Sequence, residues 1–303
     1  MKIINMLLKF LSISKTAKYW FSFSTVLIVL SFVALSVWGL RPGIDFVGGS
    51  ILEVRGENAT VASIRTSLEK NNQKSIEVQS TGNNSVQIRM QQLDNDQHAK
   101  ILDALKQEFP GLEELRFDSV GPIFSRDLVF KSVLAIILSS FGILIYLAFV
   151  FYKSSAVVSS WAFGTFAVVA LIHDVIIIAG FFAVYAHFFN ASADSLFVTA
   201  ILTVIGFSVH DTIVIYNRIK SNLRLLRLPF GELVDLSILE TFTRSINTSV
   251  TSLLVLLSLL FFGGSTIRPF VATLCFGIVV GTYSSVFVAT PLLVWWQERG
   301  KKK

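Results

Sequence analysis

Six long apolar runs constrain this chain most strongly, because each can cross a bilayer as a helix. A membrane-spanning helix needs about 20 predominantly apolar residues. The fifth run reaches that length only when Phe242–Asn247 are added to it, which draws Arg244 into the membrane. We therefore predict an α-helical polytopic membrane protein with six transmembrane helices. The runs are Tyr19–Leu40, Ser132–Tyr152, Val157–Tyr185, Leu196–Tyr216, Thr248–Phe262 and Phe270–Trp296.

Composition agrees with a membrane protein. Hydrophobic residues make up 53% of the chain and charged residues 15%, whereas about a quarter of the residues in soluble domains are charged. The first apolar run is longer than the core of a signal peptide, so we expect an uncleaved anchor. The single cysteine, Cys275, cannot form an intrachain disulfide or a structural zinc site.

The distribution of Lys and Arg predicts the orientation in the cell inner membrane. Basic residues gather at the two termini and in alternate loops, while the two short opposite loops contain only Arg268. This positive-inside pattern places both termini in the cytoplasm. The net charge of +6 is thereby explained without a nucleic-acid partner. The assigned cytoplasmic positions are 2, 9, 15, 18, 153, 218, 220, 224, 227, 244, 299 and 301–303.

Three regions follow from this topology. Residues 1–40 form the cytoplasmic N-terminus and the first transmembrane helix. Residues 41–131 form an extracytoplasmic domain, the only region of soluble composition. Residues 132–303 form a five-helix transmembrane bundle with a cytoplasmic loop at 217–243 and a basic C-terminus.

The extracytoplasmic domain is predicted to be a small α+β, ferredoxin-like fold. Its pattern reads strand, helix, strand, strand, helix, strand, which is the order of a split sheet. Thr60 or Asn58 can cap the first helix, and no catalytic cluster is present, so we do not expect an enzyme. The strands are predicted at 50–55, 75–79, 85–90 and 114–120, with helices at 60–70 and 94–109 and a hairpin turn at 81–84.

The loop at 217–243 allows two structures. Apolar and basic residues interleave along it, as in an amphipathic helix lying on the lipid surface and broken at Pro229 and Gly231. It can equally be a helical extension of the fourth span.

Ionisable residues inside the predicted spans are few, and each is a functional hypothesis because charge in a bilayer is costly. They are His173, Asp174, His210, Asp211 and Arg244. The two aspartates and the arginine lie 16, 17 and 19 residues from the outer ends of their spans, which is roughly 24 to 29 Å along a helix. We therefore expect all five in one layer of the inner half of the membrane.

A proton site is the functional interpretation of this layer. Burial favours the neutral form of a carboxyl group, and a nearby guanidinium favours the charged form. An Asp211–Arg244 pair that breaks and forms would thus load and release a proton. The alternatives are a static ion pair between spans four and five, and a local pair of Arg244 with Glu240 one turn away. A metal site is disfavoured because adjacent His and Asp residues point about 100° apart on a helix.

Small residues in the sixth span predict close helix packing. Gly277, Gly281 and Ser285 recur every four residues, a small-xxx-small face. The packing partner can be inside the chain or in another subunit.

Several strings together resemble the SecF branch of the SecD/SecF family, within the resistance-nodulation-division superfamily. They are Gly43-Ile44-Asp45-Phe46-Val47-Gly48-Gly49 after span one, Leu171-Ile172-His173-Asp174 in span three, the segment Gly206–Ile219 in span four, Thr243–Ser249 at span five and Gly281–Phe287 in span six. Their order and spacing follow the family over nearly the whole chain. His210, Asn217 and Glu240 depart from its usual residues.

The resemblance implies a function in protein transport through the Sec pathway. It implies a heterodimer with SecD, association with the SecYEG channel and use of the proton motive force to complete translocation of exported preproteins. The family's proton-linked carboxylate maps to Asp211 and its span-five arginine to Arg244. Asp45, Gly48 and Gly49 match a motif that we interpret as structural, with Asp45 capping the glycine turn. Protons and membrane lipids are the other expected partners, and no cofactor or metal is expected.

Two further functions remain open at this point. The first is a proton-driven small-molecule or lipid exporter of the same superfamily, although such exporters usually carry two six-span halves in one chain. The second is a passive membrane scaffold with static buried charges.

Overall fold

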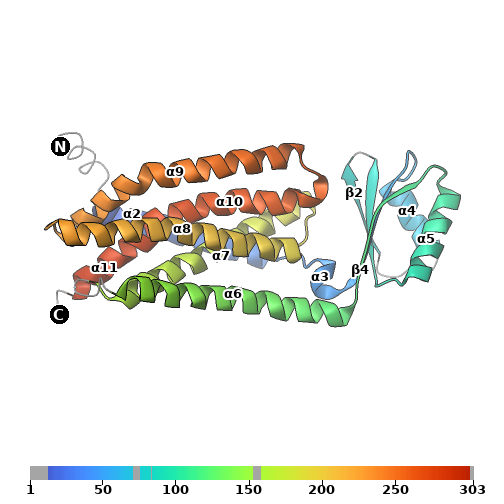
Figure 1. The fold of residues 1–303 in the computed structure, drawn as a ribbon. Helices are drawn as coiled ribbons and strands as arrows, with labels where there is room; N and C mark the ends of the chain where they lie inside the picture. The colour runs from blue at the N-terminus through green and yellow to red at the C-terminus, as the bar shows by residue number, and fades with distance from the viewer. Residues whose placement is uncertain (1–12, 71–75, 83, 153–157, 301–303) are drawn as a thin grey trace. The chain divides into compact units, whose positions relative to one another are not determined.

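A computed structural model describes residues 13–70, 76–82, 84–152 and 158–300 (Figure 1). The chain divides into two compact units. The membrane unit comprises the residues up to 41, those from 134 to 191 and those from 196 onward, and the sheet unit comprises residues 42–133 and 192–195. Several predicted features lie outside the described residues, namely the basic residues at 2, 9, 153 and 301–303 and part of the hairpin turn at 81–84.

Six helical spans are present among the described residues, as predicted. The first five are single helices, and the sixth is composite, because a π-helix interrupts it. They are α2 (Ile13–Val37), α6 (Pro122–Val150), α7 (Ser160–Phe189), α8 (Ser195–Leu225), α9 (Phe230–Phe262), and α10 (Arg268–Ser284) with π-helix η3 (Ser285–Ala289) and α11 (Thr290–Gly300). A short 3₁₀ turn, η2 (Ser265–Ile267), precedes α10.

Most of the segment predicted as a loop, 217–243, is helical. Helix α8 continues to Leu225 and α9 begins at Phe230, so a short link joins two extended helices. The helical-extension interpretation is correct for α8, and the surface-lying helix is not formed. Pro229 precedes the first residue of α9, where a proline costs no hydrogen bond. Gly231 lies inside the first turn of α9 and does not break it.

Helix α6 also begins earlier than the predicted residue 132. Its first residue is Pro122, and proline at the first helical position removes only an N–H that has no partner there. The polar residues 125–127 therefore lie within this helix.

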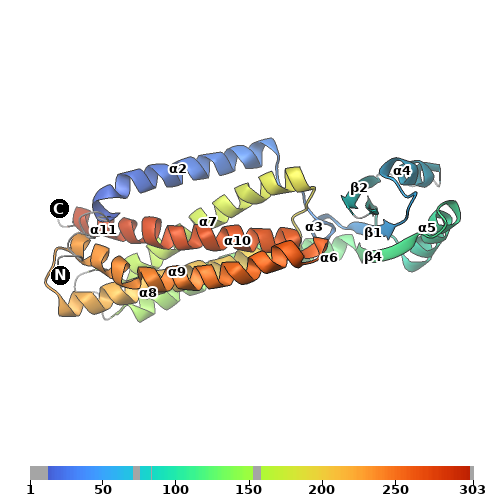
Figure 2. The same cartoon turned by 90° about the horizontal axis from the view of Figure 1, so that it is seen from above.

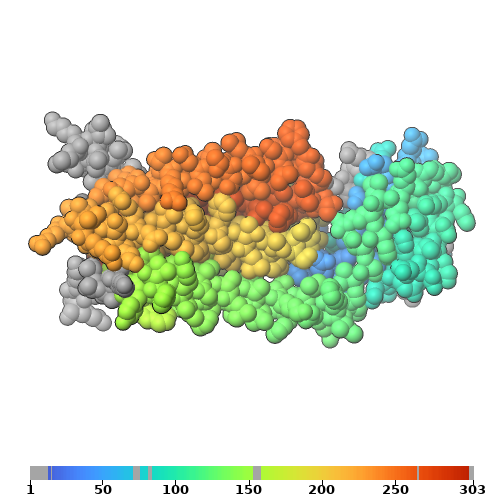
Figure 3. Space-filling view, in the orientation of Figure 1, coloured from blue at the N-terminus to red at the C-terminus, as the bar shows by residue number. Residues whose placement is uncertain are grey.

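The core of the membrane unit is aromatic and close-packed. Phe151, Phe163 and Tyr216 are fully buried, with the Phe151 and Phe163 rings stacked at 4.7 Å. Helix α2 packs against α7 (Figure 2), and a Cβ on Gly180 would lie 2.5 Å from the Cα of Ser31. Helix α10 packs against both α7 and α9. On one face of this unit α6, α8 and α9 lie side by side (Figure 3).

The sheet unit has four antiparallel strands in the order β2-β3-β1-β4. This is the predicted ferredoxin-like arrangement. Leu52, Ile64, Ile88 and Leu105 form its core between the sheet and two helices. The elements are α3 (Ile44–Val47), β1 (Gly49–Arg55), α4 (Val61–Lys70), β2 (Glu77–Gly82), β3 (Ser85–Met90), α5 (Asn95–Glu108) and β4 (Glu113–Val120).

Side-chain caps explain where the two sheet-unit helices begin. The Thr60 hydroxyl accepts a hydrogen bond of 3.2 Å from the Ser63 N–H, so Thr60 rather than Asn58 caps α4. Asp94 and Gln97 form a reciprocal capping box at the start of α5. Both arrangements satisfy N–H groups that have no partner within the helix.

Candidate functional site in the membrane unit

A buried carboxyl group, Asp174 of α7, is the centre of a hydrogen-bond network between three helices. Its exposed fraction is 1%. Ser208 of α8 donates to its Oδ2 at 2.7 Å, and Ser284 of α10 donates to the same oxygen at 2.8 Å. His173 Nδ1 lies 2.9 Å from Oδ1. Both oxygens of this carboxyl group therefore face polar protein groups rather than lipid.

Asp211 lies on α8, close to Asp174 but in a different environment. Its exposed fraction is 3%, and it forms no ion pair within the described residues. Its carboxyl group lies against Ser245 of α9 and Thr282 of α10. The Ser245 hydroxyl is buried and completes no hydrogen bond with the described residues. Asp211 is thus a shielded carboxyl group without a fixed counter-charge.

Hydroxyl groups connect Asp174 to the part of α8 that carries Asp211, and together they form one polar layer. Ser208, which bonds to Asp174, lies one helical turn before Asp211. Its carbonyl oxygen accepts a hydrogen bond of 3.0 Å from Ser285, whose hydroxyl is 2.9 Å from that of Thr212. The layer therefore extends from α7 through α8 to the last span.

The small-residue face of the sixth span brings that span close to α8 at this layer. A Cβ on Gly277 would overlap a methyl group of Val204, and one on Gly281 would lie 2.9 Å from the Cβ of Ser208. Gly277, Gly281 and Ser285 therefore pack against α8 inside the chain, which decides between the two partners that the sequence left open.

The π-helix η3 begins directly at this layer. Ser284 is the last residue of α10 and Ser285 the first of η3. Thr290 donates a hydrogen bond of 2.6 Å to the carbonyl oxygen of Ser285. Single π-turns inside helices occur often at functional sites.

Arg244 lies near Asp211 but is not bonded to it. Its side chain is exposed on α9, and it is close enough for an electrostatic interaction with the carboxyl group. No hydrogen bond or ion pair of this guanidinium is present with any residue that the structure describes. The predicted Asp211–Arg244 pair is therefore not formed in this state of the chain.

The alternative pair of Arg244 with Glu240 is wrong. Glu240 instead accepts two hydrogen bonds from Arg218 of α8, at 2.6 and 2.8 Å. Asn222 donates a third, at 2.8 Å. Because α8 and α9 run beside each other at this level, a partner on the next helix replaces the one on the same helix.

The two His-Asp dipeptides differ in the structure. Both His173 and Asp174 are buried and contact each other, although adjacent helix residues were expected to diverge. His173 Nε2 has no hydrogen-bond partner within the described residues. His210, by contrast, is exposed on α8 while Asp211 is buried. No group of three or more His, Cys, Asp or Glu side chains gathers in the described residues.

The glycine motif lies in the sheet unit and has a different geometry from the one predicted. Gly48 and Gly49 have φ values of 79° and 126°, a region that favours glycine. Asp45 does not cap this turn. Its carboxylate accepts hydrogen bonds from the N–H and the hydroxyl of Ser195, the first residue of α8, and so caps that helix instead.

Four hydroxyl residues of the site were missed from sequence. Ser208, Ser245, Thr282 and Ser284 each contact a buried carboxyl group. A usable signal was present, because Ser208 precedes Asp211 by three residues and Ser245 follows Arg244. Ser and Thr are common in membrane helices, however, and only the packing shows which of them point inward.

Comparison with known protein families shows which family the chain belongs to. The model of the SecD/SecF protein export membrane protein C-terminal region matches residues 100–299, and that of the SecD/SecF GG motif matches residues 33–60. The chain belongs to the SecD/SecF family. The GG motif of this family member contains Asp45, Gly48 and Gly49.

Curated relatives of this SecD/SecF family member are translocase subunits. The protein translocase subunit SecF of Thermobaculum terrenum is 42% identical over 91% of this chain and 90% of its own length. The SecF subunit of Synechocystis is 36% identical over 91% of this chain and 90% of its own length. The crystal structure of Thermus SecDF, a translocon-associated membrane protein, matches with 32% identity and a TM-score of 0.82, covering 94% of this chain and 38% of that one.

Proposed function

We propose that this SecD/SecF family member acts with a SecD-type partner to complete protein export across the inner membrane, driven by the proton motive force. The observation that carries the proposal is Asp211, which is buried in the membrane unit without an ion-pair partner among the described residues. A buried carboxyl group that no cation holds in the charged form can gain and lose a proton without breaking a salt bridge.

The position of Arg244 supports a switch in the charge of Asp211 that contact with a second subunit would control. A charged side chain exposed on a membrane-spanning helix is costly unless it meets a partner. Arg244 is near enough to act on Asp211 electrostatically while its guanidinium faces outward. A partner that covers this face of α9 would hold or release Arg244 and thereby alter the charge at Asp211.

The similarity to SecDF of Thermus also supports a SecD-type partner. The chain covers 38% of the SecDF chain of Thermus, a protein whose name joins SecD and SecF. A partner corresponding to the remainder of that protein would complete a twelve-span assembly, which we expect to contact the SecYEG channel.

Helix α8 provides a covalent route from the proton site to the sheet unit. Within the sheet unit, Asp45 caps the first residue of α8, and the same helix carries Ser208 and Asp211. Movement of α8 on protonation would therefore pull on the GG motif. We place the sheet unit on the extracytoplasmic side and both termini in the cytoplasm, as the Lys and Arg distribution predicts, so that exported preproteins meet the sheet unit.

The proposal is tested by gradient-driven export in inner-membrane vesicles that carry the chain with its partner. Asp211→Asn keeps shape and removes only the ionisable proton, so export should proceed through its ATP-dependent stage and lose the acceleration by an imposed gradient. Asp235→Asn is the matched control. Asp235 is also 3% exposed but accepts hydrogen bonds from Ser14 at 3.0 and 2.7 Å, which an amide oxygen retains in part.

The control variant should keep the gradient response. Vesicles with Asp211→Asn that still accelerate export under a gradient would refute the proton role of this residue.

A further inference from the structure

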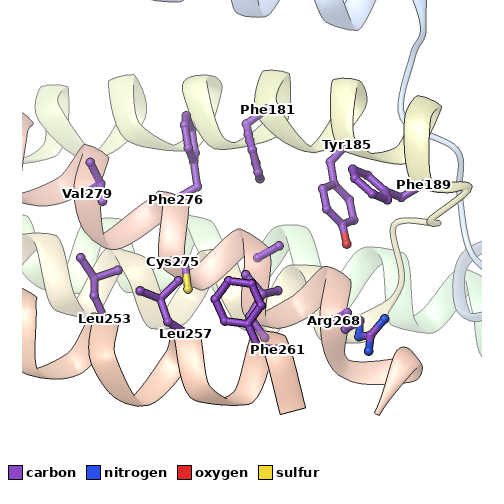
Figure 4. A pocket seen from close by; sticks show the side chains of 12 residues that line it. Phe181, Tyr185, Phe189, Leu253, Leu257, Phe261, Arg268, Cys275, Phe276 and Val279 are labelled. Carbon is purple, nitrogen blue, oxygen red and sulfur yellow. The ribbon is translucent and has the colours of Figure 1, made fainter. Parts of the chain in front are cut away.

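An apolar pocket in the membrane unit lies apart from the polar layer. It has a volume of about 760 Å³ and is lined by residues of α7, α9 and α10 (Figure 4). Its wall is formed by Phe181 and Phe276, whose rings stack at 4.0 Å, and by leucines and Phe261 of α9. None of the residues of the proton site lines it.

One end of the pocket carries its only charged residue. Arg268, the first residue of α10, lies at the end near Tyr185 and Phe189 (Figure 4). The Tyr185 hydroxyl points toward the same end. Arg268 forms no ion pair with any acidic side chain that the structure describes. The pocket thus combines an apolar lining with an arginine at one end that no described acidic side chain neutralises.

We propose that this pocket binds an anionic phospholipid, with one acyl chain between α7, α9 and α10 and the headgroup phosphate on Arg268. The charge pattern matches this ligand, because a guanidinium binds a phosphate by charge-assisted hydrogen bonds. Tyrosine and arginine near the end of a membrane helix lie at the level of the lipid headgroups.

The volume of the pocket favours a lipid acyl chain over a protein helix as its occupant. A helix with side chains is about 10–12 Å wide, so the pocket would contain only about 7–10 Å of its length by that cross-section. An extended acyl chain is far thinner and can lie along the pocket. A neighbouring helix could cover the opening but could not fill the space.

Cys275 allows a direct test, since it is the single cysteine of the chain and lines the pocket. The purified full chain is reconstituted into phosphatidylcholine vesicles with increasing phosphatidylglycerol, and the rate of maleimide labelling at Cys275 is measured. Bound lipid should slow labelling as phosphatidylglycerol increases. In Arg268→Gln, about ten times more phosphatidylglycerol should be needed for the same protection, as expected for loss of a charged hydrogen bond.

Matched variants distinguish lipid binding in the pocket from other effects of a substitution on the labelling rate. Arg126→Gln removes another exposed arginine and should keep the protection. Val279→Trp fills the pocket and should abolish the response to phosphatidylglycerol, whereas Val255→Trp, on a 63% exposed position outside the lining, should keep it. Asp211→Asn should also keep it, because lipid binding does not depend on the proton site.

Two results would overturn the proposal. One is labelling that does not respond to phosphatidylglycerol, or that responds equally in the wild type and Arg268→Gln. The other is protection of Cys275 in the complex with its partner that is equally complete in pure phosphatidylcholine, which would identify a protein surface as the occupant.

Discussion

Ser208 Oγ donates a hydrogen bond of 2.7 Å to Asp174 Oδ2, and this contact ties the buried carboxyl group of α7 to α8, the helix that carries Asp211. Ser208 lies on the same helix as Asp211, one turn away. A change in the position of α8 at Asp211 therefore alters the hydrogen bonding of Asp174. The two acids are parts of one site rather than independent charges.

Removing this contact should destabilise the membrane unit. We expect Ser208→Ala to lower the free energy of unfolding by about 1–3 kcal/mol, because the buried Asp174 Oδ2 loses one of its two donors and keeps only Ser284. Ser258→Ala is the control, since Ser258 is exposed and bonds to its own helix. Thermal unfolding in detergent measures both, and equal stability of the two variants would contradict the role of Ser208.

Gly277 should tolerate no side chain. Gly277→Ala places a Cβ against Val204, and we expect a loss of about 1–3 kcal/mol from overpacking. Gly206→Ala is the control on the facing helix, because a Cβ at position 206 would meet no atom within 4 Å. That variant should be neutral or more stable by up to about 1 kcal/mol from helix propensity. The same thermal unfolding assay compares them, and a stable Gly277→Ala would mean that α8 and α10 are packed less closely.

The cap on α8 should behave as one interaction. Asp45→Ala and Ser195→Ala each remove the side-chain hydrogen bond between them, and an N-cap contributes about 1 kcal/mol. The double variant should lose about as much as either single variant, because both remove the same contact. Additive losses in the double-mutant cycle would show that the two residues act separately.

Glu240 should be coupled to Arg218 and independent of Arg244. Glu240→Gln and Arg218→Ala remove the same ion pair, so their effects on the melting temperature should be small and non-additive. Glu240→Gln and Arg244→Ala should be additive. Strong coupling between positions 240 and 244 would restore the local pair that the structure excludes.

Local patterns along the chain were enough to predict the number of spans and the order of elements in the sheet unit. An apolar run of sufficient length must be a helix in lipid, and strand alternation identifies a half-buried strand. Asp174 and Asp211 could also be identified as candidate functional residues from the local sequence, because a carboxyl group inside an apolar run is unusual whatever its partners are.

The pairing of polar residues, by contrast, emerged from the packing of the folded chain. Asp45 and Ser195 are 150 residues apart, and nothing in the GG motif indicates that its aspartate caps a later helix. Glu240 had a suitable arginine one turn away on its own helix, yet α8 presents Arg218 with two donors. Which side chains form hydrogen bonds therefore depends on how the helices pack. Packing brings together residues that are far apart in the sequence, and their separation along the chain does not predict their distance in space.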